Sequence, residues 1–351
     1  MTKKKFLWLL VALLGMPFSA NAQRGSFDID RWYEITDALR LRAQTEHISK
    51  HIIDETFRAP AFIPSIVKSD KNQAEFKLTL NNYLDRTVSK SRISDGQKMR
   101  ATYPTLLSRV ESKYGIPPHI MLAFWGMESN YGAVKSRHQL IDAFMTLIYD
   151  GRRETFFSNQ LIALMKIADK NKLNISNIHG SWAGAMGHFQ FIPTTLEQYG
   201  SDGNNDGSID IIHSVGDAMF SAGNYLNKLG WNPNEKIVRR VILPSDFDIS
   251  MLDGKTKLTL PQWAALGVTN PDGTPIPSNE MRAGLVADVS YIESLRNSAQ
   301  NNTENVNMDV DVVPMPVIDA YLTYPNFYRI KKWNNSNWYA IAIATLSDAL
   351  K

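Results

Sequence analysis

Apolar residues recur every three or four positions from Asp28 to about Leu226, which is typical of amphipathic helices. The run "TLLSRVESKYGIPPHIMLAFWGMESNYG" predicts two helices separated at Gly115 and the pair Pro117-Pro118, because proline is favoured at the start of a helix and breaks its interior. The second of these helices is apolar nearly all round, so we expect it to be central.

The helical pattern continues and then changes character. Two helices are expected in "QLIDAFMTLIYDGRRETFFSNQLIALMKIADKNKL", around a turn at Asp150-Gly151, and another in "SVGDAMFSAGNYLNKLG", ending at Gly230. After Trp231 short β-branched runs such as "EKIVRRVILP" alternate with turn residues. The sequence therefore predicts a mainly α (α+β) protein.

The change of pattern also predicts how the chain is organised. We expect a helical lobe over residues 23–231, a smaller mixed α/β lobe over 232–330, and a helix within 331–351 that returns to the helical core. Within the mixed lobe, the Asn-rich stretch 297–311 predicts a mobile loop.

The first 22 residues have the layout of a secretory signal. Three lysines precede an apolar run from Phe6 to about Phe18, and small residues lead to Ala22, where we expect cleavage. A membrane anchor is the alternative, but the apolar run is shorter than the ~20 residues that a spanning helix needs. We therefore expect a periplasmic protein that is soluble after cleavage.

Charge and cysteine content exclude several classes. Loss of the leader's three lysines leaves 35 basic against 35 acidic residues, which does not suggest a nucleic-acid surface. The chain has no cysteine, so disulfides, thiol catalysis, cysteine-ligated metals and a lipidated N-terminal cysteine are all excluded.

One carboxylate stands out at the end of the apolar helix. Glu128 would share a helical face with Met121, Phe124 and Trp125, and an apolar setting raises the pKa of a carboxyl as a general acid requires. The alternative is a structural glutamate paired with an arginine such as Arg137, Arg152 or Arg153.

Two later stretches carry polar groups in unusual settings. In "HGSWAGAMGHFQFIP", small residues allow close backbone approach, and Ser181 and Gln190 offer hydrogen bonds; simple tight packing is the alternative. In "SDGNNDGSID", Asp202, Asn204 and Asp206 occupy positions 1, 3 and 5 of an EF-hand-like loop, but position 12 is His213. The loop could bind calcium through Asp217 or form an Asx-rich turn without metal.

Together these stretches resemble the lytic murein transglycosylases of the membrane-bound lytic transglycosylase B type, glycoside hydrolase family 103, in a form without a lipid anchor. The motifs "YGIPPHIMLAFWGMESNYG", "LIYDGRR", "GSWAGAMGHFQFIPTT", "DGNNDGSIDI", "SVGDA" and "NYLNKLGW" follow in the family's order. The resemblance implies a lysozyme-like helical core with the mixed lobe inserted before the C-terminal helix.

The resemblance also implies a reaction and its site. The family cleaves the MurNAc-β-1,4-GlcNAc bond of peptidoglycan without water, leaving a 1,6-anhydro end, with Glu128 matching the single general acid and base. Matches to sugar-binding residues are Ser181, Gln190, Tyr225, Asn334 and, less closely, Tyr83. The family's calcium loop is matched by Asp202, Asn204, Asp206 and Asp217. Trp333 and His188 depart from the family pattern, which commonly has tyrosine at the first position and glutamine, glycine or threonine at the second.

No cofactor is expected for the chemistry, although calcium could be structural. The expected partners are peptidoglycan glycan strands and, in the cell, wall-synthesis or secretion machinery, with the chain itself a monomer. The competing interpretations are a hydrolytic muramidase and a non-catalytic, calcium-dependent peptidoglycan-binding protein, since fold alone does not imply activity.

Overall fold

The computed structural model describes residues 27–72, 78–134, 136–279, 281–303 and 317–351. The predicted leader over residues 1–22 lies outside the described part of the chain. The first helices are α1 (Ile29–Thr45), α2 (Lys50–Thr56), α3 (Pro64–Lys71), α4 (Leu80–Thr87), α5 (Lys90–Thr102), α6 (Pro104–Tyr114) and α7 (Pro118–Ser129). They are followed by α8 (Leu140–Asp150), α9 (Glu154–Asn171), η1 (Ile175–Asn177), α10 (Pro193–Tyr199) and α11 (Val215–Lys228).

The remaining elements mix helices and strands. Helical segments here are η2 (Ile249–Met251), α12 (Leu260–Ala265), α13 (Val289–Thr303), α14 (Pro325–Trp333) and α15 (Asn337–Ala349). The strands of the chain are β1 (His138–Gln139), β2 (His179–Gly180), β3 (Val238–Leu243), β4 (Leu258–Thr259), β5 (Arg282–Val286) and β6 (Ile318–Thr323). The expectation of a mainly helical protein with a mixed second part is confirmed.

Helix boundaries follow the local signals in the sequence. Gly115 ends α6 in the left-handed region with φ 71°, and Pro118 opens α7, as the break at Gly115 and the proline pair predicts. Gly151, with φ 80°, likewise ends α8 before α9. Side chains of Asp28, Ser214 and Ser336 cap the N-termini of α1, α11 and α15 by accepting backbone N–H bonds.

The helix expected within 331–351 is present as α15, and a separate helix, α14, precedes it, with residues 334–336 between the two. One expectation about the second part needs correction. The stretch 297–311 is not a loop throughout, because α13 continues to Thr303; its residues 304–311 lie outside the described chain. The hydroxyls of Ser294 and Ser298 bond to carbonyls one turn back, so polar residues are accommodated on this exposed helix.

A four-stranded antiparallel sheet has the order β3-β6-β5-β4. β6 pairs antiparallel with both β3 and β5, so the last strand of the chain lies between two strands that come earlier in the sequence. The sheet has its own apolar cluster, which includes Val241, Trp263 and Leu285, beside the larger cluster of the helical part.

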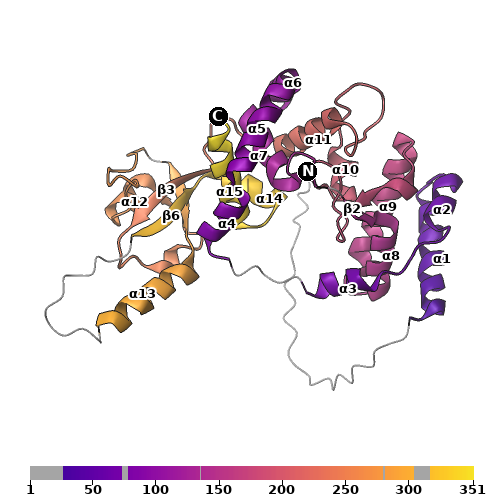
Figure 1. Ribbon diagram of the computed structural model, residues 1–351, viewed down its shortest axis with the longest axis horizontal. Helices are drawn as coiled ribbons and strands as arrows, with labels where there is room; N and C mark the ends of the chain where they lie inside the picture. Colours follow the sequence, from indigo (N-terminus) through magenta and orange to yellow (C-terminus); the bar gives the residue numbers. More distant parts are fainter. Residues whose placement is uncertain (1–26, 73–77, 135, 280, 304–316) are drawn as a thin grey trace, which may run out of the picture.

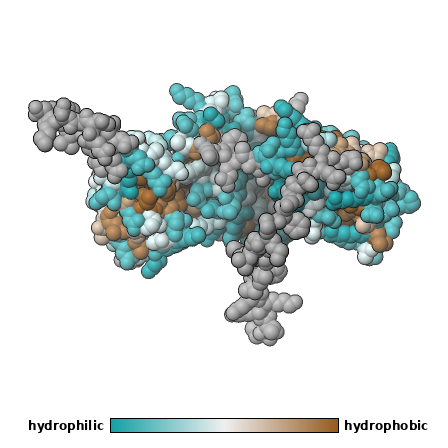
Figure 2. Space-filling model, turned by 90° about the horizontal axis from the view of Figure 1, so that it is seen from below, coloured by the Kyte–Doolittle hydropathy of each residue, from teal (hydrophilic) through white to brown (hydrophobic). Residues whose placement is uncertain are grey.

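The elements form two ends joined by a central group of helices. Figure 1 shows α1, α2, α8 and α9 at one end, the sheet with α12 and α13 at the other, and α4, α7, α14 and α15 between them. α15 packs against both α7 and α4. Seen from below, the surface is hollowed between the two ends (Figure 2). Within the described residues, no helix has the length and apolar character needed to cross a membrane.

Candidate active site

Glu128 lies in the last turn of α7, a helix that is buried along most of its length. Met121 and Phe124 have no exposed surface and Trp125 is 1% exposed, so the central position expected for this helix is confirmed. The end of the helix is tied to a later loop, because the Trp125 indole N–H donates to His188 Nδ1 over 3.0 Å and the Ser129 hydroxyl donates to the His188 carbonyl over 2.7 Å.

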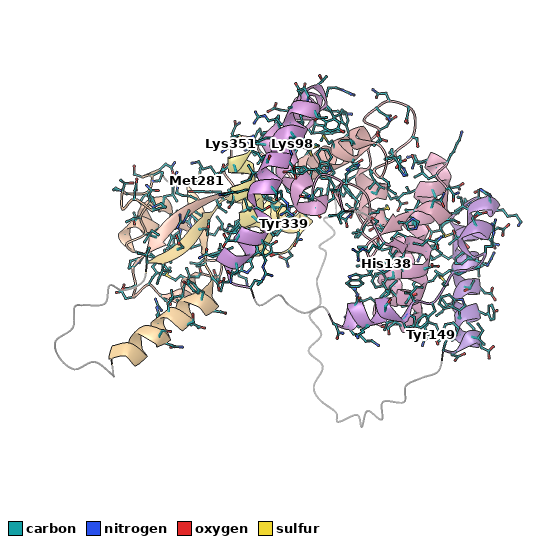
Figure 3. The ribbon with its side chains drawn as sticks, in the orientation of Figure 1. Lys98, His138, Tyr149, Met281, Tyr339 and Lys351 are labelled. Atoms are coloured by element: carbon teal, nitrogen blue, oxygen red, sulfur yellow. The ribbon has the colours of Figure 1, made fainter. Side chains whose placement is uncertain are left out.

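Two side chains from the C-terminal helices α14 and α15 donate hydrogen bonds to the Glu128 carboxyl. The indole N–H of Trp333, at the end of α14, donates to Oε1 over 2.9 Å. The hydroxyl of Tyr339, in α15, donates to the same oxygen over 2.5 Å. Both rings also pack against Phe124, with centroid distances of 5.0 and 6.2 Å. Figure 3 shows Tyr339 in the central region of the molecule.

This setting changes the acidity of Glu128. Burial raises the pKa of its carboxyl from the usual 4.5 to about 7, while the hydrogen bonds from Tyr339 and Trp333 act in the opposite direction. A carboxyl with a pKa near neutrality is present in both protonation states, so it can donate a proton and later accept one.

The three arginines considered in the sequence analysis as structural partners of Glu128 make other contacts. Arg152 donates from Nε to Asp70 Oδ2 over 2.7 Å, and Arg153 pairs with the other oxygen of the same buried carboxylate. Arg137 lines a cavity with Ser181 and Gln190. Among the described residues, the side chains that bond to Glu128 are therefore neutral donors, and no ion pair holds the pKa of its carboxyl low.

Tyr83 reaches the same site from α4. The pKa of its half-buried hydroxyl is raised first by burial and then by the nearby charge of Glu128. The structure thus brings this predicted substrate residue into the neighbourhood of the carboxyl.

Tyr225 belongs to an aromatic cluster beside Trp333. Its ring stacks on Tyr199 with a centroid distance of 4.5 Å, lies 4.9 Å from the Trp333 ring and 6.0 Å from Phe191. Asn334, the next residue after Trp333, has an exposed side chain, and its hydrogen bonds to Ile330 and Ser336 run through its backbone.

Ser181 and Gln190 share a cavity of about 590 Å³, together with Arg137, His138 and Trp182. The Ser181 hydroxyl accepts from the Ala185 N–H over 3.0 Å, and Gln190 Nε2 donates to the Gly187 carbonyl over 2.9 Å. Tight packing also accounts for Gly184, because a Cβ there would lie 2.2 Å from Phe144. Figure 3 labels His138, which lines this cavity, near α8, and Tyr339 in the central group of helices.

The predicted calcium ligands lie in and just after the loop that follows α10, and the oxygens of Asp202 and Asp217 accept hydrogen bonds from backbone N–H groups. Asp217, fully buried, accepts from the N–H groups of Gly203 and Asp210 over 2.8 and 2.9 Å and from a third amide. Asp202 accepts from the N–H groups of Asn205 and Gly207. The amide of Asn204 donates to Asp206 over 2.8 Å.

Each of these contacts uses one lone pair of an oxygen, whereas a calcium ion needs six or more oxygens converging on one point. Throughout the described ranges, no three or more acidic or histidine side chains are grouped so as to hold a metal. Asx turns close the loop, and calcium binding by it stays a prediction.

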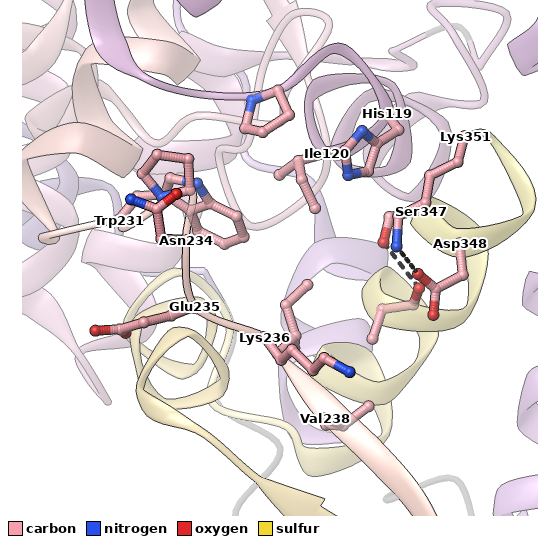
Figure 4. Close-up of a pocket in the computed structure, with 14 residues that line it drawn as sticks. His119, Ile120, Trp231, Asn234, Glu235, Lys236, Val238, Ser347, Asp348 and Lys351 are labelled. Carbon is pink, nitrogen blue, oxygen red and sulfur yellow. Dashed lines mark hydrogen bonds and ion pairs between the residues drawn. The ribbon is translucent and has the colours of Figure 1, made fainter. Parts of the chain in front are cut away.

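Another cavity, of about 400 Å³, lies at the N-terminal end of α7 (Figure 4). Its walls include His119, Trp231, Lys236 and Asp348, and none of the residues predicted to bind substrate or metal. This cavity therefore lies at the end of α7 opposite Glu128 and is separate from the predicted site.

The helical core and the single carboxyl held by aromatic donors define a lysozyme-like protein. The chain belongs to the transglycosylase SLT domain family, whose model matches residues 31–348. It is 28% identical over 276 residues to membrane-bound lytic murein transglycosylase B of Escherichia coli strain K12, an alignment that covers 76% of this chain and 66% of that protein. The family membership that the motifs indicated is confirmed.

Solved structures agree with this assignment. SltB3 from Pseudomonas aeruginosa, in complex with NAG-anhNAM-pentapeptide, is 33% identical with a TM-score of 0.78, covering 91% of this chain and 79% of that one. The Escherichia coli lytic transglycosylase Slt35, in complex with calcium, is 25% identical with a TM-score of 0.72, covering 91% of this chain and 92% of that one. The lysozyme-like fold expected from the sequence is thereby confirmed.

Proposed function

We propose that this chain is a peptidoglycan lytic transglycosylase that cleaves the MurNAc-β-1,4-GlcNAc bond without water and leaves a 1,6-anhydroMurNAc end. The observation that carries the proposal is the Glu128 carboxyl, whose pKa is about 7 and whose side-chain hydrogen bonds come from Tyr339 and Trp333. The similarity to SltB3, which was solved with an anhydro-sugar peptide, supports this choice of product.

In the first step, protonated Glu128 donates its proton to the glycosidic oxygen. Loss of the leaving sugar places positive charge on the anomeric carbon, and the N-acetyl carbonyl of the substrate can assist from the opposite face. Most glycosidases use a second carboxylate for that task, although substrate-assisted exceptions exist. A site whose carboxyl is surrounded by aromatic donors suits the substrate-assisted route.

In the second step, the Glu128 carboxylate takes the proton of the substrate's own 6-hydroxyl, which attacks the anomeric carbon. Because the hydroxyl belongs to the same sugar ring, ring closure is intramolecular and competes well with attack by water. The hydrogen bonds from Tyr339 and Trp333 stabilise the carboxylate that forms between the two steps.

We propose that the predicted substrate residues act in two groups. Tyr83 and Tyr225 lie on the side of Glu128 and Trp333, where aromatic faces can stack on sugar rings. Ser181 and Gln190 line the cavity of about 590 Å³ and would hold a neighbouring sugar by hydrogen bonds. Asn334, exposed after Trp333, would contact substrate at the rim.

Product analysis tests the proposal. Sacculi digested with the purified protein should yield muropeptides that are lighter by one water than muramidase products, as seen by mass spectrometry. The matched control is Glu128→Gln, which keeps the shape of the side chain and should release no product. Hydrolysed ends alone would establish a muramidase, and binding without cleavage by the wild type would establish a wall-binding protein.

We also propose that the mature chain acts as a periplasmic monomer on glycan strands. The secretory layout of residues 1–22 and the absence of cysteine support this location. Fractionation of cells that express the full chain, followed by size-exclusion chromatography with light scattering, tests both points. Recovery in the membrane fraction or as a stable dimer would contradict them.

Calcium binding by the loop of Asp202, Asn204, Asp206 and Asp217 remains a proposal from the family resemblance and from the calcium complex of Slt35. The backbone contacts of these side chains would have to open for an ion to enter. Titration with calcium, followed by calorimetry, tests whether they do.

A further inference from the structure

Both hydrogen bonds to Glu128 end on the same oxygen. Trp333 Nε1 and Tyr339 Oη donate to Oε1 over 2.9 and 2.5 Å. A carboxyl oxygen that accepts two donors is a poor place for the proton, because the proton would face two other hydrogens. The proton of neutral Glu128 is therefore directed to the other oxygen, Oε2.

Trp333 differs chemically from a hydroxyl residue at this place. An indole N–H can only donate, whereas a hydroxyl can rotate and accept. Trp333 therefore holds Oε1 as an acceptor in both protonation states of Glu128, and its own donor never titrates.

The indole is itself held firmly. Its ring packs against Phe124, Phe191 and Tyr225, with centroid distances of 5.0, 5.4 and 4.9 Å. The Tyr225 hydroxyl also donates to the Lys332 carbonyl, one residue before Trp333, over 3.4 Å. Rings from α7, α11 and the loop before α10 thus fix the direction of the N–H.

We propose that Trp333 is a positioning residue that commits a single oxygen of Glu128, Oε2, to both proton transfers. The inference rests on the proposed function, since it assumes that Glu128 acts as acid and then as base. It also implies that the leaving oxygen and the 6-hydroxyl both approach Glu128 from the side of Oε2.

The proton balance follows from this assignment. In the acid step the Oε2–H bond breaks, an O–H bond forms on the leaving sugar, and the electron pair of the glycosidic bond moves to that oxygen. In the base step the 6-hydroxyl O–H bond breaks, Oε2–H forms again, and the freed oxygen pair closes the anhydro ring. Glu128 returns to its starting state while Oε1 keeps both donors.

Replacement of the donor tests the proposal. Trp333→Phe retains an aromatic ring but removes the N–H, so the charged form of Glu128 loses one charge-assisted hydrogen bond. The pKa of Glu128 should therefore rise, so that the alkaline limb of the kcat/KM profile shifts to higher pH by about one unit, and kcat should fall roughly tenfold. The titratable neighbours Tyr83 and Tyr339 have raised pKa values, so both stay neutral in this range and the limb reports Glu128.

Two further variants separate positioning from packing. Trp333→Tyr keeps a ring with a donor and should restore most of kcat and the wild-type limb. Trp338→Phe removes an indole N–H at the start of α15 that, in the described part of the chain, does not donate to Glu128, and should leave the profile unchanged. Circular dichroism and melting temperature check that each variant is folded.

The outcomes also separate this proposal from the proposed function. If Glu128→Gln is inactive but folded Trp333→Phe shows the wild-type limb and kcat, the function stands and the role of Trp333 is refuted. If Trp333→Phe and Trp338→Phe shift alike, the effect is general and the role is again refuted. If Glu128→Gln still yields anhydro products, the assignment of Glu128 fails and the role of Trp333 fails with it; if the wild type yields only hydrolysed ends, the proposed function itself fails.

Discussion

The pKa values of carboxyls in two regions of the molecule are shifted in opposite directions. Glu128 has neutral side-chain donors and a buried setting that raises its pKa to about 7. Asp202, in the loop after α10, accepts backbone N–H bonds, of which that from Gly207 contributes most, and its pKa is held below the usual 3.8. The difference shows that burial without strong charge compensation makes a proton donor, whereas backbone amides make a permanently ionised structural group.

Of the changes considered, removal of the Tyr339 hydroxyl should have the largest effect, on the pKa of Glu128 and on kcat. In Tyr339→Phe the Glu128 carboxylate loses a charge-assisted hydrogen bond, so its pKa rises and kcat should fall by roughly 10- to 100-fold. A pH profile of kcat/KM on solubilised glycan measures both changes. Tyr149→Phe, which loses a hydroxyl contact to the Asp28 backbone far from Glu128, should behave as wild type.

The raised pKa of Glu128 also has a consequence for stability. The folded pKa of about 7 exceeds the usual 4.5, so the native state binds a proton that the unfolded state releases, and stability falls as pH rises through that window. Glu128→Gln removes this loss and should be more stable than wild type at about pH 8, by at most ~3 kcal/mol. Urea unfolding at about pH 8 and about pH 4 measures the difference, which should be small at the lower pH. Equal stability of the two proteins at the higher pH would show that the carboxyl is not desolvated.

The loop should respond to the loss of a backbone acceptor. Asp217→Asn puts an amide where both oxygens now accept N–H bonds, so one buried N–H would face a donor and stability should fall by about 1 to 2 kcal/mol. Asp206→Asn, in the exposed part of the same loop, should change stability by under ~0.5 kcal/mol. Thermal unfolding of the two variants compares them directly. Similar losses would mean that Asp217 has no special structural role.

Calcium should have the smallest effect. Because the backbone contacts of the loop carboxylates must open for an ion to enter, calcium binding should be weak, and millimolar calcium or a chelator should change the melting temperature by no more than about one degree. Differential scanning calorimetry with and without the ion gives the answer. A large rise that Asp202→Asn abolishes would show that the loop rearranges into a calcium site.

Local signals in the sequence were sufficient for many elements. The break at Gly115 and Pro118, the turn at Gly151 and the β-branched run that became β3 all follow from conformational preferences of a few neighbouring residues. Glu128 could likewise be singled out, because burying an unpaired carboxylate in an apolar helix costs free energy, so that such a residue indicates either a structural partner or a catalytic role.

The partners of that carboxylate could not be predicted. Trp333 and Tyr339 lie 205 and 211 positions after Glu128, and no periodicity joins residues so far apart. The one available signal was the departure of Trp333 from the family pattern. Two of the arginines proposed as structural partners, Arg152 and Arg153, instead bind Asp70, since the packing of α3 against α8 brings that carboxylate to them.

The sequence by itself therefore determined the helical character of the chain, its family and the acid that it places at the end of α7. These follow from periodicity, capping and the order of motifs, which are properties of the linear chain. The tertiary structure alone decided which groups surround that acid, that both donors share one oxygen, and that the acidic loop turns its oxygens to backbone amides. Such contacts depend on how distant elements pack, and packing sets the burial and hydrogen bonding on which the acidity of Glu128 depends.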